Sequence, residues 1–174
     1  MKRLFVLSLM SLFVLTAATS NAQGGDKPKP ASPPATATQT IGDLTIKIDY
    51  SQPSVKGRTI GKDLEPKAGQ VWRTGANKAT VFEVNKDVKV EGKALPAGKY
   101  GLFTLVDGNN WTIIFNKTSD QWGAFNYKDA DDALRVTVKA GKADPFAETL
   151  TFNIDAKGNV ILLWGDNKVQ FKVK

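Results

Sequence analysis

From Thr45 onwards, apolar and polar residues alternate in a series of short runs. Within residues 45–50, Ile46, Ile48 and Tyr50 fall on one face of an extended chain, and polar side chains fall on the other. A period of two is typical of β-strands that cover a core with one face. The same pattern predicts strands over residues 80–84, 88–90, 99–106, 111–116, 134–139, 149–154, 160–164 and 168–173.

Turns rich in Gly, Asn and Asp separate several of these runs, as antiparallel hairpins require. They lie at residues 107–110, 155–159 and 165–167, and residues 96–98 supply another. A helix of at most about two turns is expected over 127–134, with Asp129 near its start. The predicted fold class is all-β: an antiparallel β-sandwich or jelly-roll-like domain with one short helix. A closed barrel is the main alternative.

Two segments interrupt the alternation. Residues 51–70 contain Pro53, Pro66 and three glycines, and long irregular loops in compact domains tend to be functional or disordered. Residues 116–127 place Trp122 and other aromatic residues among amides, which is a high density of large side chains for a connection. Both segments are therefore candidates for carrying function.

The N-terminal residues predict export. Two basic residues precede an apolar stretch that is too short to span a bilayer, and small residues follow, as in a cleavable signal peptide over 1–22. Cleavage is expected after Ala22, and because the chain has no cysteine, no lipid anchor is expected at the new terminus. Residues 23–40 are expected to be a disordered linker rich in Pro and Lys, followed by one domain over 41–174.

Composition narrows the chemistry. The chain has no histidine and no cysteine, which excludes Ser-His-Asp and Cys-His catalysis, disulfides and the usual zinc, copper or haem sites. A cysteine-free exported domain favours a bacterial, periplasmic or secreted protein. The net charge of +7 falls to +5 without the signal, which holds two basic residues and no acidic one. Because the lysines are scattered, no nucleic acid partner is expected. No membrane span is expected either, because the one apolar stretch is too short.

Two mechanisms that need neither histidine nor cysteine, paired-carboxylate catalysis and calcium binding, find little support in the sequence. A glycosidase needs two facing carboxyls, and most aspartates fall in turns, where they have local structural roles. Asp129, Asp131 and Asp132 resemble a calcium cluster, but no glycine or distal glutamate completes an EF-type loop, so a helix start is favoured. No catalytic residue, metal or cofactor is predicted.

A candidate ligand site centres on VWRTGAN, residues 71–77. Arginine offers a planar fork for carboxylate or phosphate, tryptophan offers a face for a sugar ring or a cation, and Gly75 permits close backbone approach. Aromatic and polar residues before and after this motif complete a set suited to a pocket. The candidate ligand-binding residues are Tyr50, Arg58, Trp72, Arg73, Thr74, Asn77, Asn116, Lys117, Gln121, Trp122 and Tyr127. Tryptophan in a β domain is, however, also a common core residue.

Five motifs resemble a known family. YSQPSVKGR (50–58), VWRTGAN (71–77), LPAGKYGLFT (95–104), WTIIFNK (111–117) and QWGAFNY (121–127) together are similar to the exported bacterial domain of unknown function 2911. The resemblance covers about residues 41–174. It implies an exported bacterial domain with no established activity, and it assigns no catalytic residues.

Three functions remain open. The first is a non-catalytic binding module for a glycan or anionic envelope component, acting through Trp72, Arg73, Asn77 and Trp122. The second is a structural or assembly protein, which predicts that Trp72 and Trp122 are buried, that Arg73 pairs with an internal carboxylate and that no pocket exists. The third is a hydrolase that uses Asp or Lys residues, which predicts two carboxyls, or a lysine and a hydroxyl, converging in one cleft.

Overall fold

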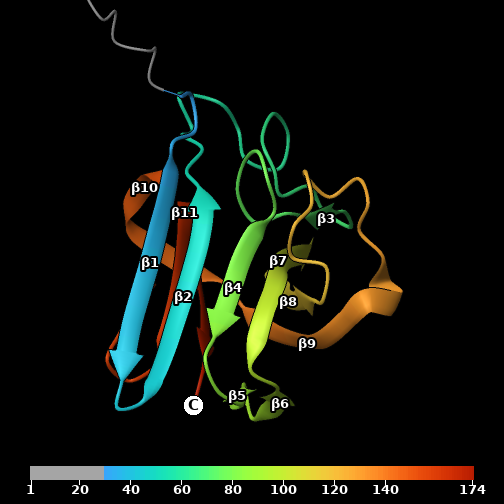
Figure 1. Ribbon diagram of the computed structural model, residues 1–174. Helices are drawn as coiled ribbons and strands as arrows, with labels where there is room; N and C mark the ends of the chain where they lie inside the picture. The colour runs from blue at the N-terminus through green and yellow to red at the C-terminus, as the bar shows by residue number, and fades with distance from the viewer. Residues whose placement is uncertain (1–29) are drawn as a thin grey trace, which may run out of the picture.

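A seven-stranded antiparallel sheet forms the larger layer of the computed structural model, which describes residues 30–174 (Figure 1). The strands run in the order β1-β2-β4-β7-β8-β9, and β3 pairs with β7. Their bounds are β1 Pro34–Ile41, β2 Leu44–Ser51, β3 Val71–Trp72, β4 Thr80–Val84, β7 Gly98–Asp107, β8 Asn110–Asn116 and β9 Asp132–Lys139. The alternation expected from the sequence is present in β2 and β4, which bury every second residue against the core.

A long hairpin forms the second layer. It consists of β10 (Gly141–Ile154) and β11 (Asn159–Lys172), and it lies behind β1 and β2 in Figure 1. A small hairpin of β5 (Val88–Val90) and β6 (Lys93–Leu95) sits at one end. The all-β class is confirmed. The closed-barrel alternative is wrong, because β1 and β9 are the two separate edges of the main sheet.

The core fills the space between the two layers. The ring of Phe82 on β4 meets that of Phe115 on β8 edge to face, with centroids 4.9 Å apart, and Phe171 on β11 lies 6.0 Å from Phe115. All three side chains are almost completely buried. The hairpin therefore supplies part of the core on which the main sheet depends.

A second, smaller apolar cluster lies on the other face of the main sheet. Phe103 on β7 and Ile114 on β8 are fully buried there, although their neighbours in sequence face the main core. Ala124 and Tyr127 from the segment after β8 pack against them. This cover explains why β7 and β8 contain consecutive apolar residues where an alternating pattern would leave one face in water.

The predicted boundary of the linker is wrong. Order was expected from residue 41, but β1 begins at Pro34 and pairs with β2 along its whole length, with Ala35 opposite Tyr50 and Ala37 opposite Ile48. Short side chains suffice there, because the strand lies at the sheet edge and backbone hydrogen bonds hold it. The predicted signal peptide, and the linker up to residue 29, lie outside the described residues.

Two further local predictions are wrong. Residues 165–167 do not form a hairpin turn but lie within β11, where Gly165 pairs with Ala147 next to a register irregularity. The predicted helix over 127–134 is reduced to one 3-10 turn, Asp129–Asp131, because β9 already begins at Asp132. Both segments contain residues common in turns and helix starts, yet strand pairing across the sheets dominates. No helix in residues 30–174 has the length and apolar character that a bilayer crossing requires.

Candidate functional site

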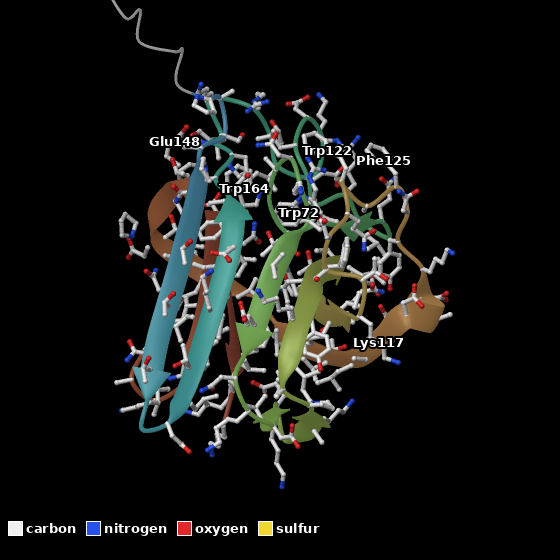
Figure 2. The ribbon with its side chains drawn as sticks, in the orientation of Figure 1. Trp72, Lys117, Trp122, Phe125, Glu148 and Trp164 are labelled. Carbon is white, nitrogen blue, oxygen red and sulfur yellow. The ribbon has the colours of Figure 1, made fainter. Side chains whose placement is uncertain are left out.

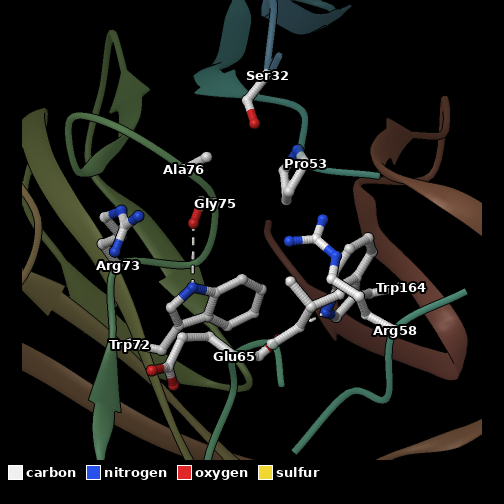
Figure 3. A pocket seen from close by; sticks show the side chains of 10 residues that line it. Ser32, Pro53, Arg58, Glu65, Trp72, Arg73, Gly75, Ala76 and Trp164 are labelled. Carbon is white, nitrogen blue, oxygen red and sulfur yellow. Dashed lines mark hydrogen bonds between the residues drawn. The ribbon is translucent and has the colours of Figure 1, made fainter. Parts of the chain in front are cut away.

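A cleft of about 190 Å³ opens between the long loop that follows β2 and the turn that follows β3 (Figure 3). Trp164 of β11 completes its wall. Its lining residues are Ser32, Pro53, Arg58, Leu64, Glu65, Trp72, Arg73, Gly75, Ala76 and Trp164. Three predicted site residues, Arg58, Trp72 and Arg73, therefore line one cleft.

Trp72 forms a fixed part of this wall. Its side chain is buried, and its indole Nε1 donates a hydrogen bond to the Gly75 carbonyl oxygen at 3.0 Å, the bond drawn in Figure 3. The turn is tight at this point: a Cβ on Gly75 would stand 2.9 Å from the Thr80 hydroxyl and 3.1 Å from the Ser51 carbonyl oxygen. A Cβ at this position would force the Thr80 hydroxyl or the backbone to shift, so VWRTGAN is first of all a structural turn.

Arg73 carries the unsatisfied polar group of the cleft. Its side chain is half-buried, and its buried Nε has no hydrogen-bond partner among the described residues. Burial lowers the pKa of the guanidinium from its ordinary value, while the charge of Glu65 acts in the opposite direction. A buried donor without a partner costs about 1–3 kcal/mol. Arg73 therefore brings a charged and incompletely paired guanidinium to the wall of the cleft.

Arg58 is held by the loop that carries it. Its Nη2 donates to the Ser54 carbonyl oxygen at 2.7 Å, and its Nε donates to the Val55 carbonyl oxygen at 3.1 Å. These two bonds fix the guanidinium plane and leave the donors on Nη1 without a partner in the described structure. Arg58 thus presents a preorganised cation at the rim.

Sequence reasoning missed several lining residues, among them Glu65 and Trp164. The indole Nε1 of Trp164 donates to the Glu65 carbonyl oxygen at 2.8 Å, which ties β11 to the long loop. The two residues are 99 positions apart in sequence, so local patterns gave no signal for their meeting. Two arginines against one glutamate leave the cleft with an excess of positive charge.

Two predicted site residues belong to the interior. Tyr50 is buried, and its hydroxyl accepts a hydrogen bond from the Phe152 backbone amide at 3.2 Å. Thr74 is completely buried, and its hydroxyl donates to that of Thr104 at 3.3 Å. Neither side chain lines the cleft, so their assignment to a ligand site is not supported by the geometry.

Asn116 and Tyr127 form a separate network around Asp132. The Asn116 amide donates to the Asp132 carboxylate at 2.8 Å, and the Tyr127 hydroxyl donates to it at 2.7 Å. Arg135 bonds to both Asp132 and Tyr127. Its Nε donates to the Asp132 carboxylate at 2.6 Å, and its Nη2 donates to the Tyr127 hydroxyl oxygen at 2.6 Å. Burial, followed by the bond to Asp132, raises the pKa of Tyr127 to about 12. The phenol stays neutral near pH 7, so this network is structural.

Of the remaining candidates, one is buried and three are exposed. Gln121 is buried, and its Nε2 donates to the Thr118 carbonyl oxygen at 2.7 Å. Lys117 and Asn77 are exposed, and the Trp122 side chain is 60% exposed. The structural hypothesis required a buried Trp122 and no pocket, and neither condition is met. Its requirement of a buried Trp72 is met.

The cleft does not provide the groups that the hydrolase hypothesis required. Glu65 is its one carboxylate, and no lysine is among its lining residues. Elsewhere in residues 30–174, no three acidic side chains gather in a way that could hold a metal ion, and Asp132 is occupied by Asn116, Tyr127 and Arg135. The arrangement is therefore suited to holding an anion and offers no evident acid–base pair.

Comparison with known proteins identifies the family. No curated protein and no solved structure matches the chain. The family model described as "Protein of unknown function (DUF2911)" matches residues 32–173, which is nearly the whole described part of the chain and includes β1. The resemblance expected from the motifs is thereby confirmed, and the chain belongs to the DUF2911 family.

Proposed function

We propose that this protein is an exported binding module that takes an anionic group, a carboxylate or a phosphate of a glycan or another envelope component, into the cleft. The observation that supports this most directly is that two guanidinium groups, those of Arg58 and Arg73, line one cleft whose only carboxylate is Glu65. A carboxylate or phosphate could accept charge-assisted hydrogen bonds from Arg73 and from the free donors of Arg58.

The size of the cleft limits what enters it. Small-molecule sites commonly occupy about 300–1,000 Å³, and this cleft measures about 190 Å³. It therefore suits one acidic group with the ring or chain atoms next to it. The partly buried Pro53, Leu64 and Ala76 supply apolar surface for those atoms, and the two arginines supply the charge.

The decisive experiment is a titration followed by NMR chemical shifts, with inorganic phosphate and glucuronate as the two probes. We expect at least one probe to shift the indole and guanidinium signals of the cleft. Arg73→Gln and Arg58→Gln should each weaken that binding about 10- to 100-fold, the value of one to two charge-assisted hydrogen bonds. Lys62→Gln is the matched control, because this exposed cation lies on the same loop outside the cleft.

Binding of neither probe, or equal binding by the wild type and Arg73→Gln, overturns the proposal. Loss of binding in Lys62→Gln would show that net charge alone is responsible, which also overturns it.

Export is a separate part of the proposal, and residues 1–22 support it by their charge and apolar pattern. Expression in a bacterium followed by fractionation and mass spectrometry should find a periplasmic or secreted chain that begins at Gln23. A full-length chain retained in the cytoplasm would contradict it.

A further inference from the structure

Two large aromatic side chains stand exposed on the segment between β8 and β9. Trp122 is 60% exposed and Phe125 is 83% exposed, the highest values among the exposed large hydrophobic residues of the described chain. Figure 2 shows both toward the end of the sandwich where Trp72 also lies. Exposed aromatic pairs cost solubility, so their presence on one loop indicates a contact surface.

Backbone hydrogen bonds hold this loop in place. The Gly123 amide donates to the Asn77 carbonyl oxygen at 3.1 Å, and the Ala79 amide donates to the Gln121 carbonyl oxygen at 3.0 Å, so Trp122 is secured on both sides. A Cβ on Gly123 would stand 2.9 Å from the Phe125 ring, so this ring lies directly against the Gly123 backbone. The loop backbone that carries the two rings is preorganised, which lowers the entropic cost of ordering the loop when a ligand stacks on them.

The loop is continuous with the cleft through Asn77. The Asn77 amide group donates to the carbonyl oxygen of Ser32, which lines the cleft, at 3.3 Å. The carbonyl oxygen of the same residue accepts the bond from Gly123, next to Trp122. One exposed residue therefore joins the rim of the cleft to the aromatic loop, and a ligand longer than the cleft could extend across it.

The charge around the aromatic pair is balanced. Lys78 pairs with Asp120 at 2.9 Å, directly beside Trp122. Three basic and three acidic residues lie on or next to the loop: Lys78, Lys117, Lys128, Asp120, Asp129 and Asp131. Surfaces that bind anionic lipid are rich in Lys and Arg on their polar side, so this balance argues against a lipid surface and favours a sugar ring that stacks on the aromatic side chains.

We propose that Trp122 and Phe125 form a second subsite, on which a sugar ring stacks while an acidic group of the same molecule occupies the cleft. The ligand class is thus an acidic oligosaccharide, such as one built from uronic acids. This inference rests on the proposed function of the cleft, and it adds that recognition extends beyond a single acidic group.

The test compares a galacturonate tetrasaccharide with monomeric galacturonate by isothermal titration calorimetry on the wild type and on Trp122→Ala/Phe125→Ala. We expect the wild type to bind the tetrasaccharide about 10-fold more tightly than the monomer, and the double variant to lose this advantage while its affinity for the monomer stays unchanged. Trp122→Phe should retain most of the advantage. Phe146→Ala, which removes a 48% exposed aromatic on β10, is the matched control and should change nothing.

The outcomes separate the two proposals. Arg73-dependent binding of phosphate or of the monomer, with no gain for the tetrasaccharide, overturns this inference and leaves the cleft proposal standing. If the wild type binds neither phosphate nor the monomer, both the cleft proposal and this inference are overturned. Sedimentation of wild type, but not of the double variant, with phosphatidylglycerol–phosphatidylcholine vesicles would assign the pair to a membrane. Self-association that only the double variant lacks would assign it to a second copy. Either result overturns the inference.

Discussion

The indole of Trp72 donates a hydrogen bond to the Gly75 carbonyl oxygen at 3.0 Å, and this bond sets the shape of the cleft wall. The turn that it closes has no room for a side chain at Gly75, as the approach to the Thr80 hydroxyl shows. Gly75→Ala should therefore destabilise the protein by about 1–3 kcal/mol, because the backbone must shift, and should weaken ligand binding in the cleft.

Urea unfolding followed by tryptophan fluorescence measures the effect on stability. Gly141→Ala is the control, because a Cβ there meets only one backbone oxygen at an ordinary contact distance of 3.8 Å. Equal unfolding midpoints for the two variants would contradict this account of the turn.

Arg73→Met should separate stability from binding. The substitution removes a buried donor that has no partner and keeps a side chain of similar length, so the free energy of unfolding should rise by about 1 kcal/mol or stay unchanged while anion binding is lost. Arg135→Met should do the opposite and destabilise, because Arg135 bonds to Tyr127 and Asp132. Thermal unfolding of both variants checks this. A marked loss of stability in Arg73→Met would show that the arginine has a structural role.

Asn116→Ala should be among the more damaging polar substitutions. Asn116 is completely buried, and its amide serves the Asp132 carboxylate, the Lys128 carbonyl oxygen and the Thr118 amide. Removing it takes one partner from the nearly buried Asp132 carboxylate and the partners of the Lys128 carbonyl oxygen and the Thr118 amide, at a cost of about 2–3 kcal/mol in the free energy of unfolding. Asn110→Ala, at an exposed position on the same strand, should have little effect. If Asn116→Ala lowers the free energy of unfolding no more than Asn110→Ala does, the structural role of this network is contradicted.

Asp155 should make stability depend on pH in the acidic range. Hydrogen bonds from the Asn159 side chain, followed by those from the Asn159 and Lys157 backbone amides, lower the pKa of Asp155. A lowered folded-state pKa means that the stabilisation is fully present above the unfolded value of about 3.9 and is lost as the pH falls through the folded-state value.

Asp155→Asn should therefore reduce the unfolding midpoint at neutral pH and have much less effect at pH values below the folded-state pKa of Asp155. Asp144→Asn, at an exposed position on β10, controls for the change in net charge. A difference between Asp155→Asn and the wild type that does not vary with pH would show that the carboxylate charge is not involved.

Much of the strand pattern could be predicted from the sequence, and the exceptions have physical reasons. The ranges 80–84 and 88–90 match β4 and β5 because alternating apolar residues face a core there. The strand β1 was missed because its alanines and threonines resemble a polar linker, and long-range pairing with β2 and packing against the core order them. Residues 165–167 have typical turn chemistry, which the pairing with β10 overrides within β11.

The candidate site was predicted only in part. The motif at residues 71–77 led to Trp72 and Arg73, because their side chains have recognisable chemistry within a few positions. Thr74 and Asn116 have the same polar character but are fully buried, and no local signal distinguishes a buried polar side chain with partners from one that faces a ligand. Trp164 was missed as a lining residue because only the packing of β11 brings it there.

The position of β11 has a consequence for how the chain reaches its folded state. Strands β7 and β8 are joined by a short turn and can pair as soon as they are made, but Phe171 and Leu162 of β11 cover the same core from the opposite layer. Until these late residues arrive, the apolar face of the growing sheet stays uncovered and prone to self-association. Folding is thus completed from the C-terminal side, and substitutions in the last hairpin should lower soluble yield more than their cost in equilibrium stability suggests.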